Sequence, residues 1–356
     1  MSVSYQAVGW NRQKKIYDGI VIAGSLSFFA VFSLVSWATQ PAITIETTLI
    51  RAFGTLAFVL LHVILVIGPL ARLDRRFLPL LYNRRHIGVM MCLFALAHGT
   101  FAIFQFHGQG NIHPLVSVLT GDGSYDSLGR FPFQPWGLAA LTILLVMAAT
   151  SHDFWLANLT PPVWKTIHML VYLAYGLLIV HVAFGVLQSE FSPVYVAAVG
   201  GGLLLVVGLH LAAGWRGIAL DREAAIGAVD GFVDVCTVGD IQNNRARIAC
   251  LAGERVAIFR YDGKISAVSN VCQHQNGPLG EGRIIDGCIT CPWHGFQYRP
   301  DNGRAPAPFE DRIPTFDVRL VGDRVLVGVK PHPPGTPVEP AVIPFDLREA
   351  NSGHSG

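Results

Sequence analysis

The sequence predicts an α-helical membrane bundle of six helices followed by a small all-β domain. The chain is 51% hydrophobic and only 14% charged over 356 residues, but these averages combine two unlike halves. Long apolar runs fill the chain up to about residue 214. The sequence after them is charged, with frequent glycines and short β-branched runs. A chain of this length has room for two domains of such different kinds.

Six apolar runs in the first half are long enough to cross a hydrocarbon core at about 1.5 Å per helical residue. These runs are residues 17–38, 49–70, 86–106, 135–152, 164–187 and 193–213. The first run is longer than the core of a signal peptide, and no small-residue cleavage site cleanly follows it. We therefore expect it to be a retained membrane helix.

By composition the chain divides into five segments. They are an N-terminal segment (1–16), the bundle (17–215), a linker of mixed charge (216–229), the β domain (230–330) and a Pro- and Gly-rich tail (331–356). We expect the tail to be extended or disordered and assign it no chemistry. The formal net charge of +2 argues for no nucleic-acid partner.

Basic residues are concentrated on one side of the predicted helices. They are Arg12, Lys14 and Lys15 before the first run, and Arg72, Arg75, Arg76, Arg84 and Arg85 between the second and third. The loops on the opposite side carry almost none, and the long loop over 107–134 has only Arg130. By the positive-inside rule both chain ends and the β domain are cytoplasmic. The expected location is the bacterial cytoplasmic (inner) membrane.

Nearly all ionisable residues inside the predicted helices are histidines, and such residues are functional candidates by default. His86 and His98 lie about 18 Å apart along the third helix, and His168 and His181 about 20 Å apart along the fifth. These two helices run in the same direction, so His86 matches the depth of His168, and His98 that of His181. Two levels of paired imidazoles suit two b-type hemes, because neutral imidazole is a good axial ligand for iron.

Other interpretations of these residues stay open. Each histidine can instead be a core residue with hydrogen-bond partners, and for His86, at the edge of its run, that interpretation is as well supported as ligation. His62 and His210 have no partner at matched depth, so we expect a structural role, with a quinone or heme-edge contact as the alternative. Arg84 and Arg85 could pair with propionates of the inner heme, or serve only as topogenic charges.

Four residues in the second half have the spacing of a metal site. Cys272 and His274 form a Cys-x-His pair, and Cys291 and His294 form a Cys-x-x-His pair after 16 intervening residues. Two thiolates and two imidazoles at this spacing can hold zinc, or a [2Fe–2S] cluster with both histidines on one iron. The other four cysteines lie in apolar or strand-like text and are expected to be free, buried thiols.

The text around these four residues resembles the two cluster-binding loops of a Rieske [2Fe–2S] domain. The residues that carry the resemblance are Gly277-Pro278-Leu279 after the first pair, and Pro292-Trp293 and Gly295 around the second. The resemblance covers about residues 230–330, where Asp-Gly turn signals separate short β-branched runs. Compared with the bc-complex type, the loops lack an extra cysteine pair and Phe296 replaces a serine, which implies a low-potential cluster.

The bundle resembles the ferric reductase-like transmembrane domain over about residues 15–215. The segments that carry the resemblance are NRRHIGVMMCLFALAHG in the third helix, and AATSHDFW and WKTIHMLVYLAYGLLIVHVAFG leading into and through the fifth. In that family, histidines of these two helices bind heme b, which implies ligand roles for His98, His168 and His181. Some members have no histidine at the position of His86, so the resemblance leaves open whether the chain binds one heme or two.

Together the two resemblances imply an oxidoreductase that moves electrons across the membrane. A cytosolic reductase or ferredoxin would load the cluster, and the hemes would pass electrons to an extracytoplasmic acceptor such as ferric iron, oxygen or a periplasmic reductase. No Gly-x-Gly-x-x-Gly follows a strand, so we expect no nucleotide-binding module in this chain. A quinol-linked membrane subunit and a redox sensor without net turnover are the alternatives.

Overall fold

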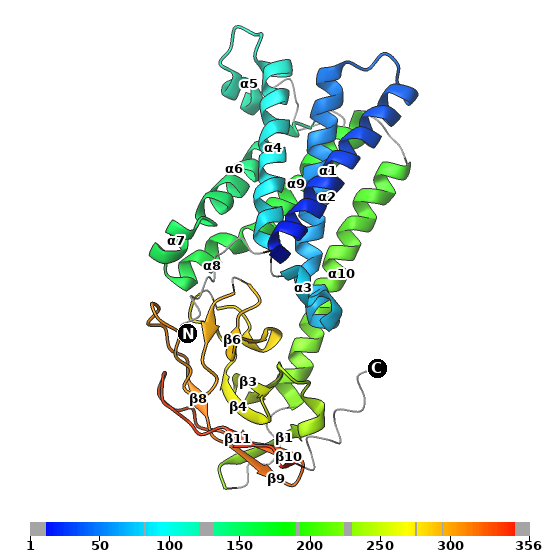
Figure 1. Cartoon of the computed structure of the whole chain (residues 1–356). Helices are drawn as coiled ribbons and strands as arrows, with labels where there is room; N and C mark the ends of the chain where they lie inside the picture. Colours follow the sequence, from blue (N-terminus) through cyan, green and yellow to red (C-terminus); the bar gives the residue numbers. More distant parts are fainter. Residues whose placement is uncertain are drawn as a thin grey trace. The chain divides into compact units, whose positions relative to one another are not determined.

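The computed structural model describes residues 12–81, 83–120, 131–189, 193–223, 230–274, 276–293 and 295–345. The chain forms two compact units. The helical unit contains residues 10–68 and 83–210, and the second unit contains residues 69–82 and the chain from 211 onward. In Figure 1 the helices run from blue to green and the strands from yellow-green to red.

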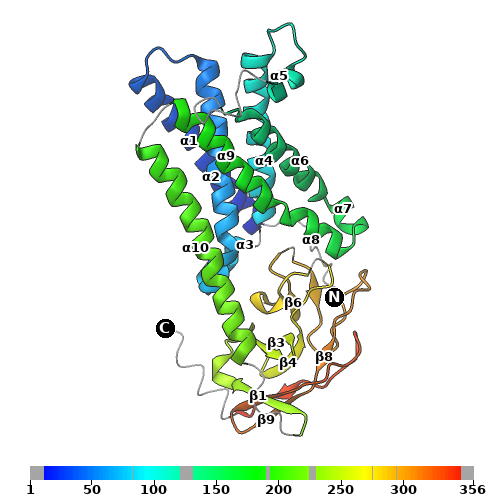
Figure 2. The same ribbon diagram turned by 180° about the vertical axis from the view of Figure 1, so that it is seen from behind.

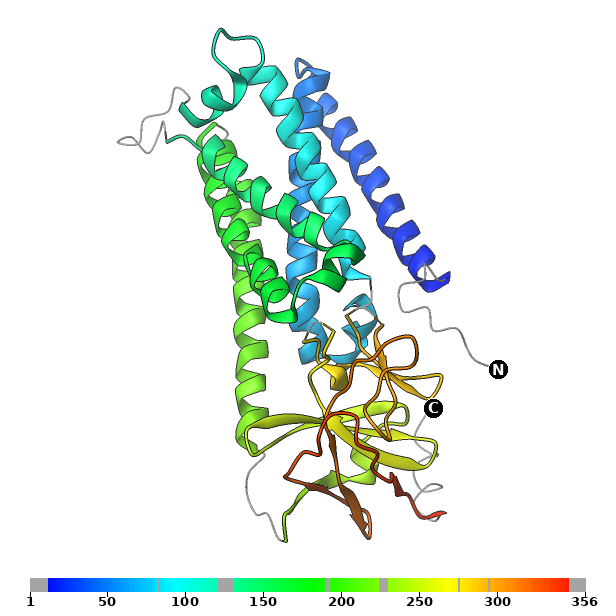
Figure 3. The same ribbon diagram turned by 90° about the vertical axis from the view of Figure 1, so that its left-hand side faces the viewer.

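Long helices make up the helical unit, and two of them end in the second unit, over residues 69–73 and 211–223. Their bounds are α1 (Arg12–Thr39), α2 (Ile45–Leu73), α4 (Arg84–His107), α6 (Gln134–Thr150), α8 (Pro161–Met169), α9 (Val171–Ser189) and α10 (Pro193–Glu223). Shorter segments are α5 (Pro114–Thr120) and α7 (Asp153–Asn158) in the helical unit, and η1 (Arg75–Phe77) and α3 (Leu78–Leu81) in the second unit. Figure 3 shows α1, α2 and α4 side by side, and α6 packs against both α4 and α9.

Within the described residues, five spans are long and apolar enough to cross a membrane: α1, α2, α4, α8 together with α9, and α10. Helix α6 is equally apolar in character but has only 17 residues, so its role as a sixth span stays a prediction. Helix α2 is the most enclosed of the five, because 44% of its most apolar window is buried, compared with 6–17% in the others. The expected helices are thus present, with α2 at the centre of the packing.

One expectation about the fifth run is wrong, because His168 and His181 do not lie on one continuous helix. Helix α8 ends at Met169 and α9 begins at Val171. Between them the N–H of Leu170 donates to the carbonyl of Ile167 at 3.1 Å, a tighter bond than the α-helical pattern. Figure 2 shows α8 bent away from the axis of α9. The two histidines therefore belong to different helices.

The linker expected over 216–229 is also wrong for residues 216–223, which continue α10 without a break. This stretch, RGIALDRE, has mostly good helix formers and no proline. Near its end the Asp221 carboxylate accepts hydrogen bonds of 2.7 Å from both Nε and Nη2 of Arg255 on β3 (Glu254–Tyr261). These bonds hold the pKa of Asp221 below its ordinary value, so the contact is lost as the pH falls through that lowered pKa.

The strands lie in the second unit and form three antiparallel sheets. Besides β3 they are β1 (Phe232–Thr237), β2 (Arg245–Leu251), β4 (Lys264–Ser269), β5 (Arg283–Ile285), β6 (Cys288–Thr290), β7 (Gln297–Tyr298), β8 (Thr315–Phe316), β9 (Val318–Val321), β10 (Arg324–Gly328) and β11 (Ala341–Val342). The sheet orders are β1-β10-β9, β11-β4-β3-β2 with β8 also paired to β4, and β5-β6-β7. The Asp262-Gly263 and Asp286-Gly287 turns have positive φ at both residues, as type I′ hairpins require.

Strand β3 separates two hydrophobic cores. Because side chains alternate along a strand, Ile258 packs into one core with Phe316, and its neighbour Phe259 packs into the other. The second core also contains Cys272 and Cys291. The loops that carry the predicted cluster ligands are therefore anchored in a packed core.

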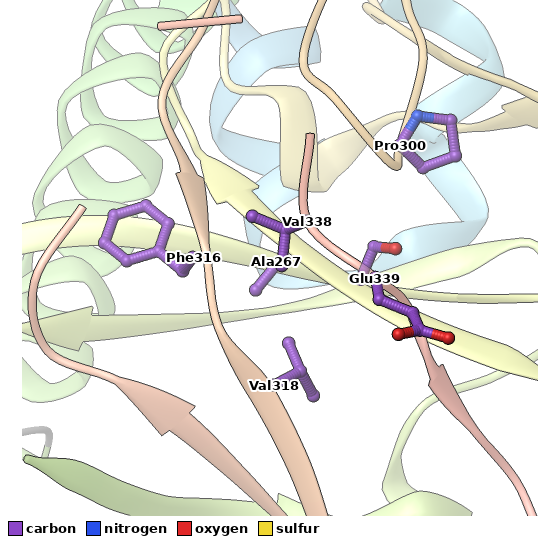
Figure 4. Close-up of a pocket in the computed structure, with 7 residues that line it drawn as sticks. Ala267, Pro300, Phe316, Val318, Val338 and Glu339 are labelled. Carbon is purple, nitrogen blue, oxygen red and sulfur yellow. The ribbon is translucent and has the colours of Figure 1, made fainter. Parts of the chain in front are cut away.

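The tail expected to be extended or disordered is part of the β domain over residues 331–345. Strand β11 pairs with β4, and Ile343 is fully buried in the core with Phe316. Figure 4 shows Val338 beside Ala267, in a hollow next to β4. The flanking prolines have no N–H to donate to a strand ladder, so pairing stops after two residues. Apolar side chains of this segment are nevertheless buried against the sheet.

Replacing Ile343 with alanine should destabilise the sheet that contains β4. Loss of a fully buried Ile side chain costs about 2–5 kcal/mol through lost burial and the cavity left behind. Hydrogen-exchange mass spectrometry should therefore show faster exchange of the β4 amides. The matched control is Val342→Ala, because Val342 is 58% exposed and its loss should change stability by less than about 0.5 kcal/mol. Equal protection in both variants would contradict this packing.

Candidate functional site

His98 on α4 and His181 on α9 face each other inside the bundle. Their ring centres are 6.1 Å apart and their ring planes are 81° apart. Nδ1 of His98 lies 2.9 Å from the carbonyl oxygen of Ile50, and Nδ1 of His181 lies 2.9 Å from that of Phe133. A carbonyl oxygen can only accept, so each Nδ1 carries the proton and each Nε2 keeps a lone pair for a metal.

The separation of this pair fits an iron between the two imidazoles. Two imidazoles that bind one metal from opposite sides at about 2 Å have ring centres roughly 6 Å apart. Glycines permit the close packing, since a Cβ on Gly54 would lie 2.7 Å from Nδ1 of His98 and one on Gly137 would lie 2.6 Å from Nδ1 of His181. The indole N–H of Trp136 is buried with no hydrogen-bond partner among the described residues, and is suited to an anionic group such as a propionate.

The two halves of this site are built in the same way. The contacts His98–Ile50 and His181–Phe133 both span 48 residues, and in each case a glycine follows the accepting residue by four positions. Ile50, Gly54 and His98 each lie 83 residues before their counterparts. The helix pairs α2–α4 and α6–α9 thus repeat one device: a carbonyl that holds the imidazole and a glycine one helical turn later that makes room for it.

The other predicted heme ligands, His86 and His168, make no ring contact with each other in the described part of the chain. His168 stacks on Trp164 with ring centres 3.7 Å apart, and its Nδ1 lies 3.0 Å from the Trp164 carbonyl oxygen. Its Nε2 lies 3.1 Å from Oγ of Ser151, which also lies 2.7 Å from the carbonyl oxygen of Met147. A hydroxyl donates one proton. When Ser151 donates it to the Met147 carbonyl, the lone pair on Nε2 of His168 is available to bind a metal.

His86, at the start of α4, has a partner that sequence reasoning missed. Its Nδ1 lies 2.8 and 3.0 Å from the two carboxylate oxygens of Asp18 on α1, and the Asn83 amide donates to the same carboxylate. Asp18 is 8% exposed, whereas the His86 side chain is 41% exposed. The sequence does contain a signal that marks Asp18. It is the only acidic residue of the run 17–38, and an ionisable residue within a span is a functional candidate.

Both histidines expected to be structural have their ring nitrogens bonded within the bundle. In His62 and His210, Nδ1 lies 2.8 Å from the carbonyl oxygen four residues earlier in the same helix. Nε2 of His62 lies 3.0 Å from the Tyr175 hydroxyl, and Nε2 of His210 lies 3.2 Å from that of Tyr172. These contacts support the structural interpretation. Arg84 and Arg85 occupy the first turn of α4, and their pairing with propionates stays a prediction.

The two predicted cluster loops share one backbone conformation. In each loop the cysteine N–H donates to the carbonyl five residues later, and the cysteine carbonyl accepts from the N–H four residues later, at 2.7–2.9 Å. The residue four positions after each cysteine has a positive φ, 57° at Asn276 and 74° at Gly295, a region that Asn and Gly tolerate. Cys272 and Cys291 therefore occupy equivalent positions in two copies of one turn.

The loops touch each other at Gly277. A Cβ there would lie 2.7 Å from Sγ of Cys291 and 3.2 Å from Trp293, so only glycine fits. Cys272 and Cys291 are 1% and 2% exposed, and all six cysteines are free thiols. Packing holds the two loops together without a disulfide, and both sulfurs remain available as ligands.

The histidine ligands are only partly placed by the structure. The His274 ring stacks on Phe296, with centres 4.9 Å and planes 5° apart, and His274 is half-buried. His294 lies outside the described residues. Among the side chains that are described, no group of three His, Cys, Asp or Glu residues is close enough to hold a single ion. Three of the four predicted ligands thus lie on two adjoining loops.

Tyr298 brings a hydrogen-bond donor to the first loop. Its hydroxyl accepts from the N–H of Gln273 at 3.0 Å and lies 3.6 Å from Sγ of Cys272, so its own proton can go to the sulfur. Burial, reinforced by the nearby Cys272, raises the pKa of Tyr298 far above its ordinary value, so the phenol stays a donor. Sequence reasoning noted the missing serine at Phe296 but missed this donor, because a lone tyrosine in a strand gives no chemical signal.

Two family profiles match the chain. The family described as "Ferric reductase like transmembrane component" matches residues 53–179, and the family described as "Rieske [2Fe-2S] domain" matches residues 231–317. The first profile includes His86, His98 and His168, and the second includes both cluster loops. The first profile thus covers part of the histidine region and ends two residues before His181, and the second covers both candidate cluster loops.

Individual proteins are similar to part of the chain. The ferredoxin component of the alkene monooxygenase system of Xanthobacter autotrophicus is 29% identical over 103 residues, which cover 29% of this chain and 84% of that protein. The ferredoxin subunit of anthranilate 1,2-dioxygenase from Burkholderia cepacia is 31% identical over 107 residues, covering 29% and 89%. A solved complex of oxygenase and ferredoxin in carbazole 1,9a-dioxygenase contains a chain that is 24% identical, with a TM-score of 0.28, covering 30% of this chain and 99% of that one.

Replacing Gly137 with alanine should lower the heme content of the purified protein by most of one heme per chain. The added Cβ would displace the His181 ring and break its hydrogen bond to Phe133. The matched control is Gly176→Ala in α9, where the added Cβ meets nothing within 4 Å. Heme per chain is measured by the pyridine hemochrome assay. The same heme content in both variants would contradict a site between His98 and His181.

Replacing Tyr298 with phenylalanine should lower the reduction potential of the cluster. A donor to a ligand sulfur stabilises the more negative, reduced cluster, so its loss favours the oxidised form. The matched control is Tyr261→Phe, which removes a buried hydroxyl that contacts Ser266 at 2.8 Å instead of a cysteine. Potentials are measured by redox titration followed by electron paramagnetic resonance. A similar potential in Tyr298→Phe and wild type would show that the hydroxyl does not act on the sulfur.

Proposed function

Since this chain joins a ferric reductase-like transmembrane domain to a C-terminal Rieske [2Fe–2S] domain, as its sequence predicts, we propose that it moves single electrons across a membrane. A cytoplasmic donor supplies the electrons, and an acceptor on the opposite side receives them. The observation that carries this proposal is the His98–His181 pair, which has the separation of a bis-histidine iron site in a chain that also holds two cluster loops. An electron-transfer role follows from the two domains, and the route is our proposal.

The site residues have separate roles in this proposal. Cys272, His274, Cys291 and His294 would hold the cluster. His98 with His181 would hold an outer heme b, and His168 with His86 an inner one. When bound, these groups supply reversible one-electron chemistry and transfer no atoms to a substrate. The carbonyls of Ile50 and Phe133 keep the outer imidazoles in the tautomer whose Nε2 can bind iron.

Covalent attachment of the cluster domain supports a role for it in electron uptake. In the two relatives the ferredoxin is a component or subunit of an oxygenase system. Here the corresponding domain is joined in one chain to the bundle, which replaces a diffusing partner by one at high effective concentration. Because the sequence shows no nucleotide-binding signature, a separate cytosolic reductase or ferredoxin would load the cluster.

The orientation rests on charge. Basic residues gather in the first turn of α1, and from the last turn of α2 to the first turn of α4, so both chain ends and the cluster domain are cytoplasmic in this proposal, and the membrane is the bacterial inner membrane. Ferric iron, oxygen and a periplasmic reductase are candidate acceptors by analogy with the family. No observation favours a quinol-linked subunit, because His62 and His210 already bond through both ring nitrogens.

Replacing His294 with alanine should stop the uptake of electrons from the cytoplasmic side. The variant lacks one of four cluster ligands, so the cluster should be lost while the hemes remain. Heme absorbance is followed in inside-out membrane vesicles after addition of a ferredoxin, its reductase and NADH. Wild type should show heme reduction, and His294→Ala only the background rate measured without ferredoxin.

The matched control is His332→Ala, a half-buried histidine of the same domain that lies outside both cluster loops and whose Nε2 lies 3.0 Å from Asp317. It should keep the cluster and reduce heme at the wild-type rate. Heme reduction in His294→Ala at the rate of this control would exclude the cluster as the uptake site, and the proposed route with it.

A further inference from the structure

The histidines of the bundle differ in what holds Nδ1. Six histidines lie in the described helices at positions where the sequence predicts membrane spans. In five of them a neutral backbone carbonyl oxygen lies 2.8–3.0 Å from Nδ1; they are His62, His98, His168, His181 and His210. In His86 the partner is the carboxylate of Asp18, at 2.8 and 3.0 Å. The inner and outer heme sites of the proposed function therefore differ in charge at this position.

The Asp18 carboxylate belongs to a built site. Asp18 is 8% exposed and Asn83 is 3% exposed, and the Asn83 amide donates to the same oxygen that faces His86. Three different positions thus meet there: one in α1, one just before α4 and one in its first turn. Burial of a carboxylate is costly unless it is hydrogen-bonded, so this arrangement fixes the His86 ring with Nδ1 toward Asp18. Nε2 is then the nitrogen that can bind a metal.

A carboxylate partner changes the chemistry of a metal-bound imidazole. An Nδ1–H that donates to a carboxylate makes the other nitrogen a stronger electron donor than one that donates to a neutral carbonyl. A stronger donor stabilises ferric iron more than ferrous iron and lowers the reduction potential. We propose that Asp18 is a positioning residue that holds His86 toward the inner heme and keeps that heme at a lower potential than the outer heme of His98 and His181.

This inference rests on the proposed function, and it adds an order of potentials to it. An inner heme of lower potential passes its electron to the outer heme with a favourable free-energy change. The direction of electron transfer, from the cytoplasmic side outward, would then be built into the bundle by one buried carboxylate. The outer site lacks this feature, since both of its imidazoles are held by carbonyls.

The test is a potentiometric titration of the purified, heme-loaded full-length protein, with redox mediators and heme absorbance as the readout. Asp18→Asn keeps the shape of the side chain and removes its charge. The lower-potential heme should shift upward by about 59 mV for each tenfold loss of preference for ferric iron, and the other heme should not move. Asp18→Glu, which keeps the charge, should retain a lower inner potential than Asp18→Asn.

The matched control is Asp74→Asn. Asp74 lies between α2 and η1, outside the membrane spans, and its carboxylate accepts from Nε of Arg76 at 2.8 Å. This variant removes the same charge without touching a histidine, so both heme potentials should equal those of wild type. His98→Ala, which removes the outer heme, assigns the remaining transition to the inner one.

Loss of one heme from Asp18→Asn that Asp18→Glu restores would also support the positioning role. Unchanged potentials in Asp18→Asn, an equal shift in Asp74→Asn, a shift confined to the outer heme, or a wild-type protein with a single heme would each overturn it. Mediators reach the hemes directly, so this result does not depend on the cluster. Failure here can therefore be distinguished from failure of the proposed uptake route, which the His294→Ala experiment tests.

Discussion

An imidazole in the interior of a membrane bundle can offer one nitrogen to a metal only when the other nitrogen has an acceptor that fixes the ring. In the outer pair these acceptors come from outside the histidine helices: His98 depends on Ile50 of α2, and His181 on Phe133 just before α6. Ring orientation at the site is therefore set by helix packing. Gly54 and Gly137 are part of the same requirement, because any larger residue would occupy the space of the ring.

The repeat of 83 residues accounts for the symmetry of the His98–His181 pair, and His86 and His168 do not follow this repeat. Adding 83 to His86 gives position 169, a methionine, and the histidine stands one residue earlier, at His168. The interruption of the helix at Leu170 falls at this same point, between His168 and His181. Asp18, from a helix outside the repeated pairs, contacts His86 through its carboxylate, whereas backbone carbonyls contact His98 and His181.

Local signals in the sequence were sufficient for the helices, the hairpin turns and the two cysteine–histidine pairs, because each depends on composition or spacing within a short stretch. Features that depend on distant contacts were not predictable in this way. The break at Leu170 follows no proline or glycine, the Pro-rich tail is ordered because Ile343 reaches a core built by other strands, and Tyr298 matters only because Cys272 lies beside it. Asp18 lies between these two cases. An acidic residue within a span indicates a functional candidate, but its contact with His86 could not be predicted from the sequence.

The continuation of α10 to Glu223 means that residues 216–223 are helical and are not a flexible linker. The exposed pair between Asp221 and Arg255 joins the end of this helix to β3 and contributes at most about 1 kcal/mol. In the same unit the half-buried His274 ring lies flat against Phe296, and this stacking fixes the ring of a predicted ligand of the first loop.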